Sequence, residues 1–278
     1  MSDITQLREK IDALDGELLN LLNERARVAQ KIGIIKNRES LPIYAPDREM
    51  KLLRGLVERS QGPLGADAIR AIYREIMSAS LAIEKDVAIA CLGPHGSPTH
   101  QAALAKFGSS VRYTFALEVS GVFELVAAEE ADCGVVPLDD PAHGLVNHTL
   151  DELAITELQI CADISPSAST EQGESPSARY LVMGRNANQP SGNDSTMLML
   201  RIEDKPGALV AALEPFKKLE INLSQFASRP AKKGSEDIFF FVQADGHTRD
   251  LQIADLFREL SKKCRAVKLL GSYPKNDA

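Results

Sequence analysis

An apolar heptad seam through residues 3–38 constrains this chain more than any other feature. Apolar side chains recur there at steps of three and four residues, and the seam comprises Ile4, Leu7, Ile11, Leu14, Leu18, Leu21, Val28, Ile32 and Ile35. The spacing predicts a single helix from Asp3 to Arg38. Such a helix is far longer than the usual ~11–12 residues and cannot bury its seam alone. It requires partner helices or a second copy of the chain.

Arg25 interrupts this seam, and Arg8 and Lys36 lie just beside it. A buried guanidinium is costly unless an anion pairs with it. From this helix alone two interpretations stay open for Arg25: a structural ion pair with another helix, or contact with a bound anion.

Two more helices complete an all-helical domain over residues 1–85. One begins near Pro46, with acidic residues in its first turn, and the other runs from about Asp67 to Lys85. Ser80 and Glu84 continue the apolar face of the last helix at i+4 spacing, which indicates either a polar pocket or fraying at the helix end. The residues that could share one pocket are Arg8, Arg25, Lys36, Arg48, Glu49, Ser80 and Glu84.

Four cations with few acids suit a small dicarboxylate. We find no nucleophile–base pair and no glycine-rich phosphate loop, which fits a reaction that needs only positioning and electrostatics. Short motifs in this domain resemble the all-helical, AroQ-type chorismate mutase domain of P-proteins, the bifunctional chorismate mutase–prephenate dehydratases. These motifs are Leu7–Asp12, Asn23–Arg25, Ile34–Lys36, Pro46–Glu49 and Arg74–Ser78.

The resemblance implies that the helices interlock with those of a second protomer. Each active site would then take the arginine at the position of Arg8 from the partner chain. Arg8 and Arg25 would hold the two carboxylates of chorismate, and Arg48 and Ser80 would support the carboxylate end.

The remaining positions are implied to serve the reacting part of chorismate. Glu49 would accept a hydrogen bond from the ring hydroxyl, while Lys36 and Glu84 would donate to the ether oxygen. A Gln can donate at any pH, but a Glu must be protonated, so we expect activity to fall as the pH rises. No cofactor is implied.

Residues 86–185 alternate strands and helices and predict a single α/β lobe. Gly93–Ala103 and Gly134–Leu150 resemble motifs of prephenate dehydratase. The family's Thr-Arg-Phe triplet corresponds to Ala178-Arg179-Tyr180, which lacks the hydroxyl. After Ile164 only the polar stretch Ser165–Ser177 precedes that triplet, so a second lobe, on the order of 80 residues or more, is missing. We expect the dehydratase activity to be lost and the exposed apolar surface to be covered by a second protomer.

Residues 196–274 follow a βαββαβ order, the ferredoxin-like plan, after a polar stretch Ala187–Ser195 that indicates a linker. Lys205–Leu209, Ile221–Leu223 and Ser228–Pro230 resemble the ACT regulatory domain. The resemblance implies that paired ACT domains bind phenylalanine. The implied contacts are a loop with Gly207, Ala208, Leu209 and Val210, and a turn with Ser228, Arg229 and Pro230. A pair of ACT domains that only dimerises is the alternative.

Composition excludes several other classes of protein. A net charge of −7 argues against nucleic acid as a partner. No run approaches the ~20 apolar residues of a membrane span, and the polar N-terminus does not resemble a signal peptide. Four separated cysteines indicate free thiols, three of them buried, in a reducing cytosol, hence a cytoplasmic protein. The five histidines show no metal-ligand spacing, and we expect His95, His100, His143 and His148 on surfaces or loops.

The sequence therefore predicts a chorismate mutase that makes prephenate for phenylalanine biosynthesis, forms a homodimer or larger assembly, and responds to phenylalanine. A bifunctional enzyme that still makes phenylpyruvate is the alternative. A non-catalytic phenylalanine-binding regulator is the alternative of another class.

Overall fold

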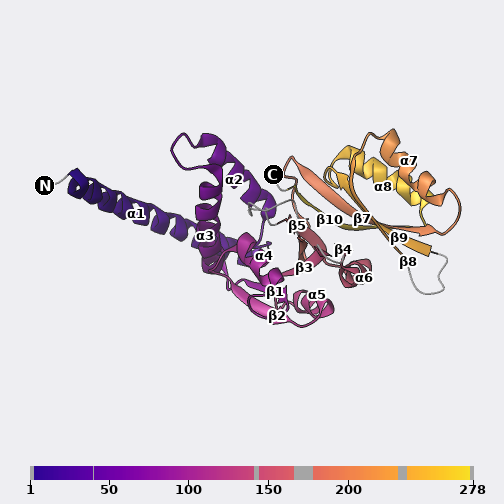
Figure 1. Cartoon of the computed structure of the whole chain (residues 1–278), viewed down its shortest axis with the longest axis horizontal. Coiled ribbons are helices and arrows are strands. Elements are labelled where there is room, and N and C mark those ends of the chain that lie inside the picture. Colours follow the sequence, from indigo (N-terminus) through magenta and orange to yellow (C-terminus); the bar gives the residue numbers. More distant parts are fainter. Residues whose placement is uncertain (1–2, 40, 141–143, 166–177, 231–236, 276–278) are drawn as a thin grey trace.

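The computed structural model describes residues 3–39, 41–140, 144–165, 178–230 and 237–275. Most of the polar stretch 165–177, and His143, lie outside these residues. Within them the chain forms three parts: N-terminal helices, a middle sheet with its helices, and a C-terminal sheet with two helices (Figure 1). This order confirms the expected succession of an all-helical part, an α/β lobe and a ferredoxin-like part.

The N-terminal part consists of α1 (Asp3–Arg38), α2 (Pro46–Arg59) and α3 (Ala66–Glu84). The first half of α1 projects away from the rest of the molecule (Figure 1). Its seam is open to solvent in the single chain: Leu7, Leu14 and Leu21 are each more than half exposed. Only the second half of α1 packs on α3, where Ala29 and Gly33 are buried.

The middle part is built on a mixed sheet in the order β2-β1-β3-β6-β5, with β4 paired to β3. Its strands are β1 (Ala88–Leu92), β2 (Arg112–Ala116), β3 (Cys133–Asp140), β4 (Gly144–Leu145), β5 (Gln159–Ile164) and β6 (Arg179–Gly184). Its helices are α4 (Pro98–Phe107), α5 (Val119–Ala127) and α6 (Asn147–Ile155). Strand β6 lies antiparallel between β3 and β5, so the chain does return to the first lobe after residue 177, as expected.

The C-terminal part has the ferredoxin-like sheet order β10-β7-β9-β8. Its elements are β7 (Asp194–Glu203), α7 (Ala208–Lys218), β8 (Leu223–Pro230), β9 (Asp237–Asp245), α8 (Leu251–Lys263) and β10 (Ala266–Pro274). Alternate residues of β7 face opposite ways, as the period of a strand requires. Leu198 and Leu200 pack in the core with α7 and α8, whereas Met197 and Met199 pack against the middle part.

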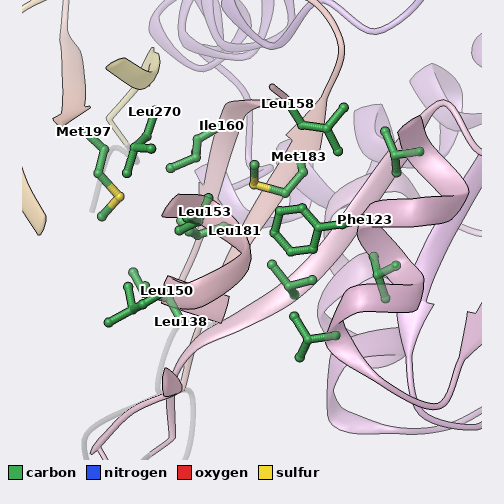
Figure 2. Packing of buried hydrophobic residues seen from close by; sticks show 14 of the residues in the cluster. Phe123, Leu138, Leu150, Leu153, Leu158, Ile160, Leu181, Met183, Met197 and Leu270 are labelled. Carbon is green, nitrogen blue, oxygen red and sulfur yellow. The ribbon is translucent and has the colours of Figure 1, made fainter. Parts of the chain in front are cut away.

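This second contact bears on one expectation. The helix-free face of the C-terminal sheet covers apolar surface of the middle sheet within one chain, and pairing with a second protomer stays a prediction. Figure 2 shows Met197 and Leu270 beside Ile160, and all three belong to one buried cluster. Strand β10 comes so close to β5 that a Cβ at Gly271 would lie 2.3 Å from the Ile160 carbonyl oxygen.

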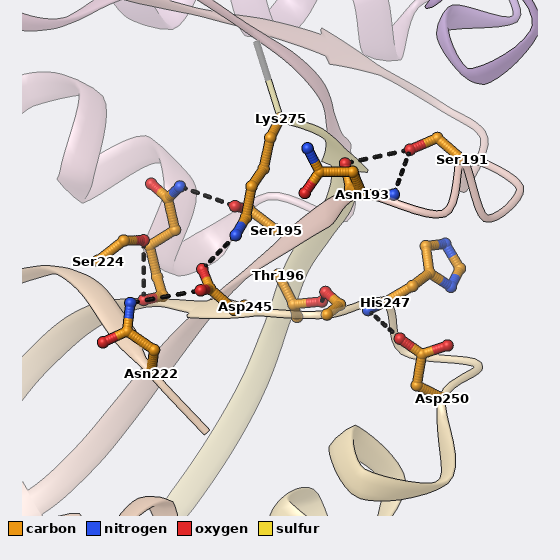
Figure 3. Close-up of polar contacts among 12 residues, drawn as sticks. Ser191, Asn193, Ser195, Thr196, Asn222, Ser224, Asp245, His247, Asp250 and Lys275 are labelled. Atoms are coloured by element: carbon orange, nitrogen blue, oxygen red, sulfur yellow. Dashed lines mark hydrogen bonds and ion pairs between the residues drawn. The ribbon is translucent and has the colours of Figure 1, made fainter. Parts of the chain in front are cut away.

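The predicted linker at residues 187–195 is also corrected. Strand β7 already begins at Asp194, and Asn188, Ser191 and Asp194 are buried. The Asp194 carboxylate accepts hydrogen bonds from Ser191 and Gly192, which satisfies a buried turn. The polar residues here belong to a packed network that extends to Asp245 and Lys275, whose ion pair is 2.7 Å long (Figure 3).

Candidate active site

A cavity of about 270 Å³ lies among the three N-terminal helices. Its polar walls are Arg25 and Lys36 from α1, Arg48 and Glu49 from α2, and Ser80 and Glu84 from α3. Six of the seven predicted pocket residues are thus brought together, although they are spread over residues 25–84 of the chain. The apolar wall comprises Val28, Ala29, Ile32, Ile43, Tyr44, Ala45, Leu52, Met77 and Leu81.

Ser80 and Glu84 are ordered parts of α3, so fraying does not explain their polarity. The Ser80 hydroxyl donates to the Ile76 carbonyl oxygen over 2.8 Å and accepts a hydrogen bond from Arg25 Nη1. Because an oxygen of the same helix fixes its hydroxyl, Ser80 holds the guanidinium of Arg25 against α3. Arg25, which interrupts the apolar seam of α1, therefore faces the cavity.

Lys36 and Glu84 form an ion pair inside the cavity. Lys36 Nζ lies 2.8 Å from Glu84 Oε2 and 3.0 Å from the Ile43 carbonyl oxygen. The lysine side chain is 20% exposed and the glutamate side chain 10%. The two helices can approach because residue 33 is glycine: a Cβ there would lie 2.7 Å from Glu84 Cα.

The two remaining arginines differ in position. Arg48 lines the cavity and has no hydrogen-bond or ion-pair partner among the residues that the structure describes, so its guanidinium is open to an anion. Arg8 lies on the projecting half of α1, 17 residues before Arg25, which is ~25 Å along a helix. Within one chain Arg8 is therefore absent from the cavity.

Two contacts at the cavity come from residues that the sequence did not point to. Tyr44 lines the wall, its ring lies 5.0 Å from that of Phe107, and burial raises the pKa of its hydroxyl well above the usual value. Lys106, from α4 of the middle part, pairs with Glu49. Phe107 and Lys106 are 57 residues or more from these partners, and no local spacing in the sequence connects them.

Charged residues in the region of the dehydratase-like motifs form contacts with one another and with the C-terminal sheet. Arg179 on β6 donates to Asp163 on β5 and, over 3.3 Å, to Gln243 of the C-terminal sheet. Asp139 lies 3.9 Å from the same guanidinium, and burial raises the pKa of its carboxyl although Arg179 opposes the shift. A cavity of about 210 Å³ beside Asp139 is walled by both sheets.

His100 departs from the expected surface or loop position. It lies on α4, is 2% exposed, and its Nδ1 accepts a hydrogen bond from the backbone of Gly96 over 3.0 Å. Burial, with a contribution from nearby His95, lowers the pKa of His100 below 6.5. The imidazole is a packed side chain that ties the turn at Gly96 to the start of α4.

The predicted phenylalanine contacts lie at one edge of the C-terminal sheet. Gly207, with φ of +81°, precedes α7, whose first turn contains Ala208, Leu209 and Val210. Ser228, Arg229 and Pro230 are the last residues of β8 rather than the expected turn. Strand pairing places Pro230 opposite Ile238 and Glu203 opposite Asp237, so both segments reach the same edge. Arg229 also forms an ion pair with Asp151 on α6.

Two negative findings hold for the residues that the structure describes. They contain no group of three or more His, Cys, Asp or Glu side chains that could hold a metal ion. They also contain no helix with the length and apolar character needed to cross a membrane.

Cys91, Cys133 and Cys161 are buried free thiols, as expected, and Cys264 is partly buried.

Comparisons with known proteins identify the family of this chain. The family model for chorismate mutase type II matches residues 7–85, and that for prephenate dehydratase matches residues 89–170. A bifunctional chorismate mutase/prephenate dehydratase of Aquifex aeolicus is 34% identical, with 99% of each chain covered. The Pseudomonas aeruginosa enzyme of the same name is 29% identical, with 97% of each covered. This chain belongs to the bifunctional chorismate mutase/prephenate dehydratase family.

Solved structures support the fold of the later parts. A prephenate dehydratase from Streptococcus mutans superposes with a TM-score of 0.58 and 26% identity over 67% of this chain and 97% of that chain. One from Arthrobacter aurescens, in complex with L-Phe, gives 0.60 and 22%, over 68% and 90%. This member of the family is nevertheless short. Its alignment with the Aquifex aeolicus relative runs over 357 positions, and the chain has 278 residues, so about 80 positions of the relative have no counterpart here.

Proposed function

We propose that this protein is a chorismate mutase that rearranges chorismate to prephenate. The observation that carries the proposal is the cavity in which six polar side chains from three helices meet, three of them cationic. The rearrangement is unimolecular, so the protein has to bind the compact conformer and stabilise the charge that develops on the ether oxygen.

The charges of the cavity divide between the two ends of such a substrate. Arg25, held by Ser80, and the unpaired Arg48 offer guanidinium groups to carboxylates. Lys36 is placed to donate to the ether oxygen as the carbon–oxygen bond breaks. Glu49 accepts from the ring hydroxyl, and Glu84, once protonated, is a second donor to the ether oxygen.

A second copy of the chain completes this site in our proposal. The open half of α1 exposes Leu7, Leu14 and Leu21, a stripe that another amphipathic helix would cover. Pairing of two such helices would carry the Arg8 of each chain away from its own cavity and toward the partner's. The site would then hold a third guanidinium for the second carboxylate.

We further propose phenylalanine as the effector and the C-terminal part as its sensor. Support comes from the ferredoxin-like order, from the two motif segments at one sheet edge, and from the similar dehydratase fold solved with L-Phe. Gly207 has a left-handed backbone and no side chain, so an amino acid ligand could contact the amide groups of this turn.

Retention of dehydratase activity is the second candidate, and the match of residues 89–170 to the dehydratase model favours it. We propose instead that the activity is lost. About 80 positions of the Aquifex aeolicus relative are absent, Ala178 carries no hydroxyl, and Arg179 is held by Asp163 beneath the C-terminal sheet.

The test is product analysis of the full chain incubated with chorismate, with and without phenylalanine. Chromatography separates prephenate from phenylpyruvate, and we expect prephenate alone. Arg25→Gln should lower kcat/KM by about 100-fold, because it removes a charge-assisted contact. Arg27→Gln, on the exposed side of the same helix, is the charge-matched control and should retain activity. Phenylpyruvate above the spontaneous background would overturn the proposed loss, and an active Arg25→Gln variant would overturn the site.

A further inference from the structure

The wall of the mutase cavity is supported by the middle part of the same chain. Helix α3 is fixed to the turn after α4 by Glu75, whose Oε2 accepts hydrogen bonds from the backbone and the hydroxyl of Ser109 over 3.0 and 2.8 Å. The Ser78 hydroxyl accepts from the backbone of Ser110 over 3.0 Å. A Cβ at Gly108 would lie 2.6 Å from that of Ser78, so the two elements are in close contact.

The last two residues of α4 reach the cavity wall itself. The ring of Phe107 packs on Tyr44, and Lys106 Nζ lies 3.0 Å from Glu49 Oε1. Tyr44 and Glu49 both line the cavity, but Lys106 does not. Lys106 and Phe107, neighbours on α4 of the middle part, therefore contact Glu49 and Tyr44 in the wall of the cavity.

The Lys106–Glu49 pair is unlike the surface ion pairs of this molecule. Its side chains are 18% and 16% exposed, so water screens the attraction only weakly, and either charge would be costly without the other. Only Oε1 of Glu49 is engaged by Lys106. The other oxygen of Glu49 has no hydrogen-bond partner among the residues that the structure describes, and Glu49 lines the cavity.

We infer that Lys106 is a positioning residue of the mutase: it fixes the rotamer of Glu49 so that the free carboxylate oxygen meets the substrate hydroxyl. This inference rests on the proposed function. It gives the middle part a role in the rearrangement that does not need dehydratase chemistry, since a helical part alone would lack this cation.

Steady-state kinetics of full-chain variants tests the inference. Lys106→Ala should lower kcat/KM about tenfold, less than the loss of Arg25, because Lys106 acts through Glu49 and does not line the cavity itself. Lys106→Arg keeps the cation and should stay within about threefold of the wild type. Lys85→Ala is the matched control, because Lys85 also joins the helical part to the middle part, through a 2.6 Å pair with Asp132, but lies outside the mutase cavity. It should keep the wild-type kcat/KM.

A double-mutant cycle separates positioning from mere support of the fold. If Lys106 acts through Glu49, Lys106→Ala should cost little more once Glu49→Gln is present. Equal losses in both backgrounds, or full activity of Lys106→Ala beside an active wild type, would overturn the inference alone. Absence of mutase turnover in the wild type would overturn the proposed function and the inference with it.

Discussion

At the residue scale, the notable feature of the cavity is an ion pair between two groups that both have to donate. Lys36 and Glu84 are 2.8 Å apart, and a carboxylate in that pair offers no proton to a substrate. When the ether oxygen takes Lys36 as its donor, Glu84 becomes a donor only by binding a proton from solvent. The rearrangement transfers no proton, so Glu84 keeps this proton through the reaction, and only its protonated form is a second donor to the ether oxygen.

The pH profile of Glu84→Gln tests this dependence. We expect wild-type kcat/KM to fall as the pH rises, with a limiting slope of about tenfold per unit for one proton. The amide of Gln donates at every pH, so the variant should have a flat profile. Glu75→Gln, on the same helix but bound to Ser109 outside the cavity, should keep the wild-type slope. A flat wild-type profile, or an unchanged slope in Glu84→Gln, would contradict this role of Glu84.

At the element scale, the crossing of α1 and α3 determines where these two side chains meet. The helices pack without a side chain at Gly33, and α3 passes with Glu84 Cα within 2.7 Å of where a Cβ would stand. One extra methyl group would have to move the two backbones apart. Lys36, less than one turn from Gly33, would move with α1 and lose its geometry to Glu84.

Gly33→Ala should therefore impair both stability and turnover. Overpacking at a close helix crossing costs about 1–3 kcal/mol of unfolding free energy. We expect a loss of this size in chemical denaturation and a fall in kcat with the shift of Lys36. Gly55→Ala in α2 is the matched control, because nothing lies within 4 Å of its Cβ position. Alanine there should stabilise by up to ~1 kcal/mol through helix propensity. A neutral Gly33→Ala would mean that the crossing adjusts freely.

Elements with strong periodicity were predictable from sequence, whereas contacts between parts were not. The seam of α1 follows from local spacing, and it predicted the bounds that the helix has, Asp3 and Arg38. The turn before Asp194 has the polar composition of a linker. It is nevertheless buried, because its polar groups form hydrogen bonds with one another. Lys106 gave no local signal because its partner, Glu49, is 57 residues away.

At the scale of the whole molecule, the C-terminal sheet packs against the middle sheet within one chain. Met197, Leu270 and Tyr273 share one core with Ile160 and Leu181. A change at the C-terminal edge can thus reach the middle sheet through packed side chains, and α4 continues the contact to the mutase cavity. If phenylalanine acts along this route, its effect on the mutase rate should be smaller in Phe107→Ala and Lys106→Ala than in the wild type, and rates with and without the amino acid measure this.

The exposed first half of α1 leads to the prediction that two chains share each mutase active site. If Arg8 serves the partner's cavity, then Arg8→Ala and Arg25→Ala variants should each be nearly inactive but complement each other. In a hybrid dimer one cavity has an intact Arg25 and receives an intact Arg8, while the other lacks both. Random exchange makes half of the dimers hybrids, so activity after unfolding and refolding the mixture should recover to about a quarter of the wild type. Refolding each variant alone is the control and should recover nothing. A mixture that stays inactive while analytical ultracentrifugation shows mixed dimers would place Arg8 outside the reaction, and a monomeric chain with full turnover would remove the need for a partner.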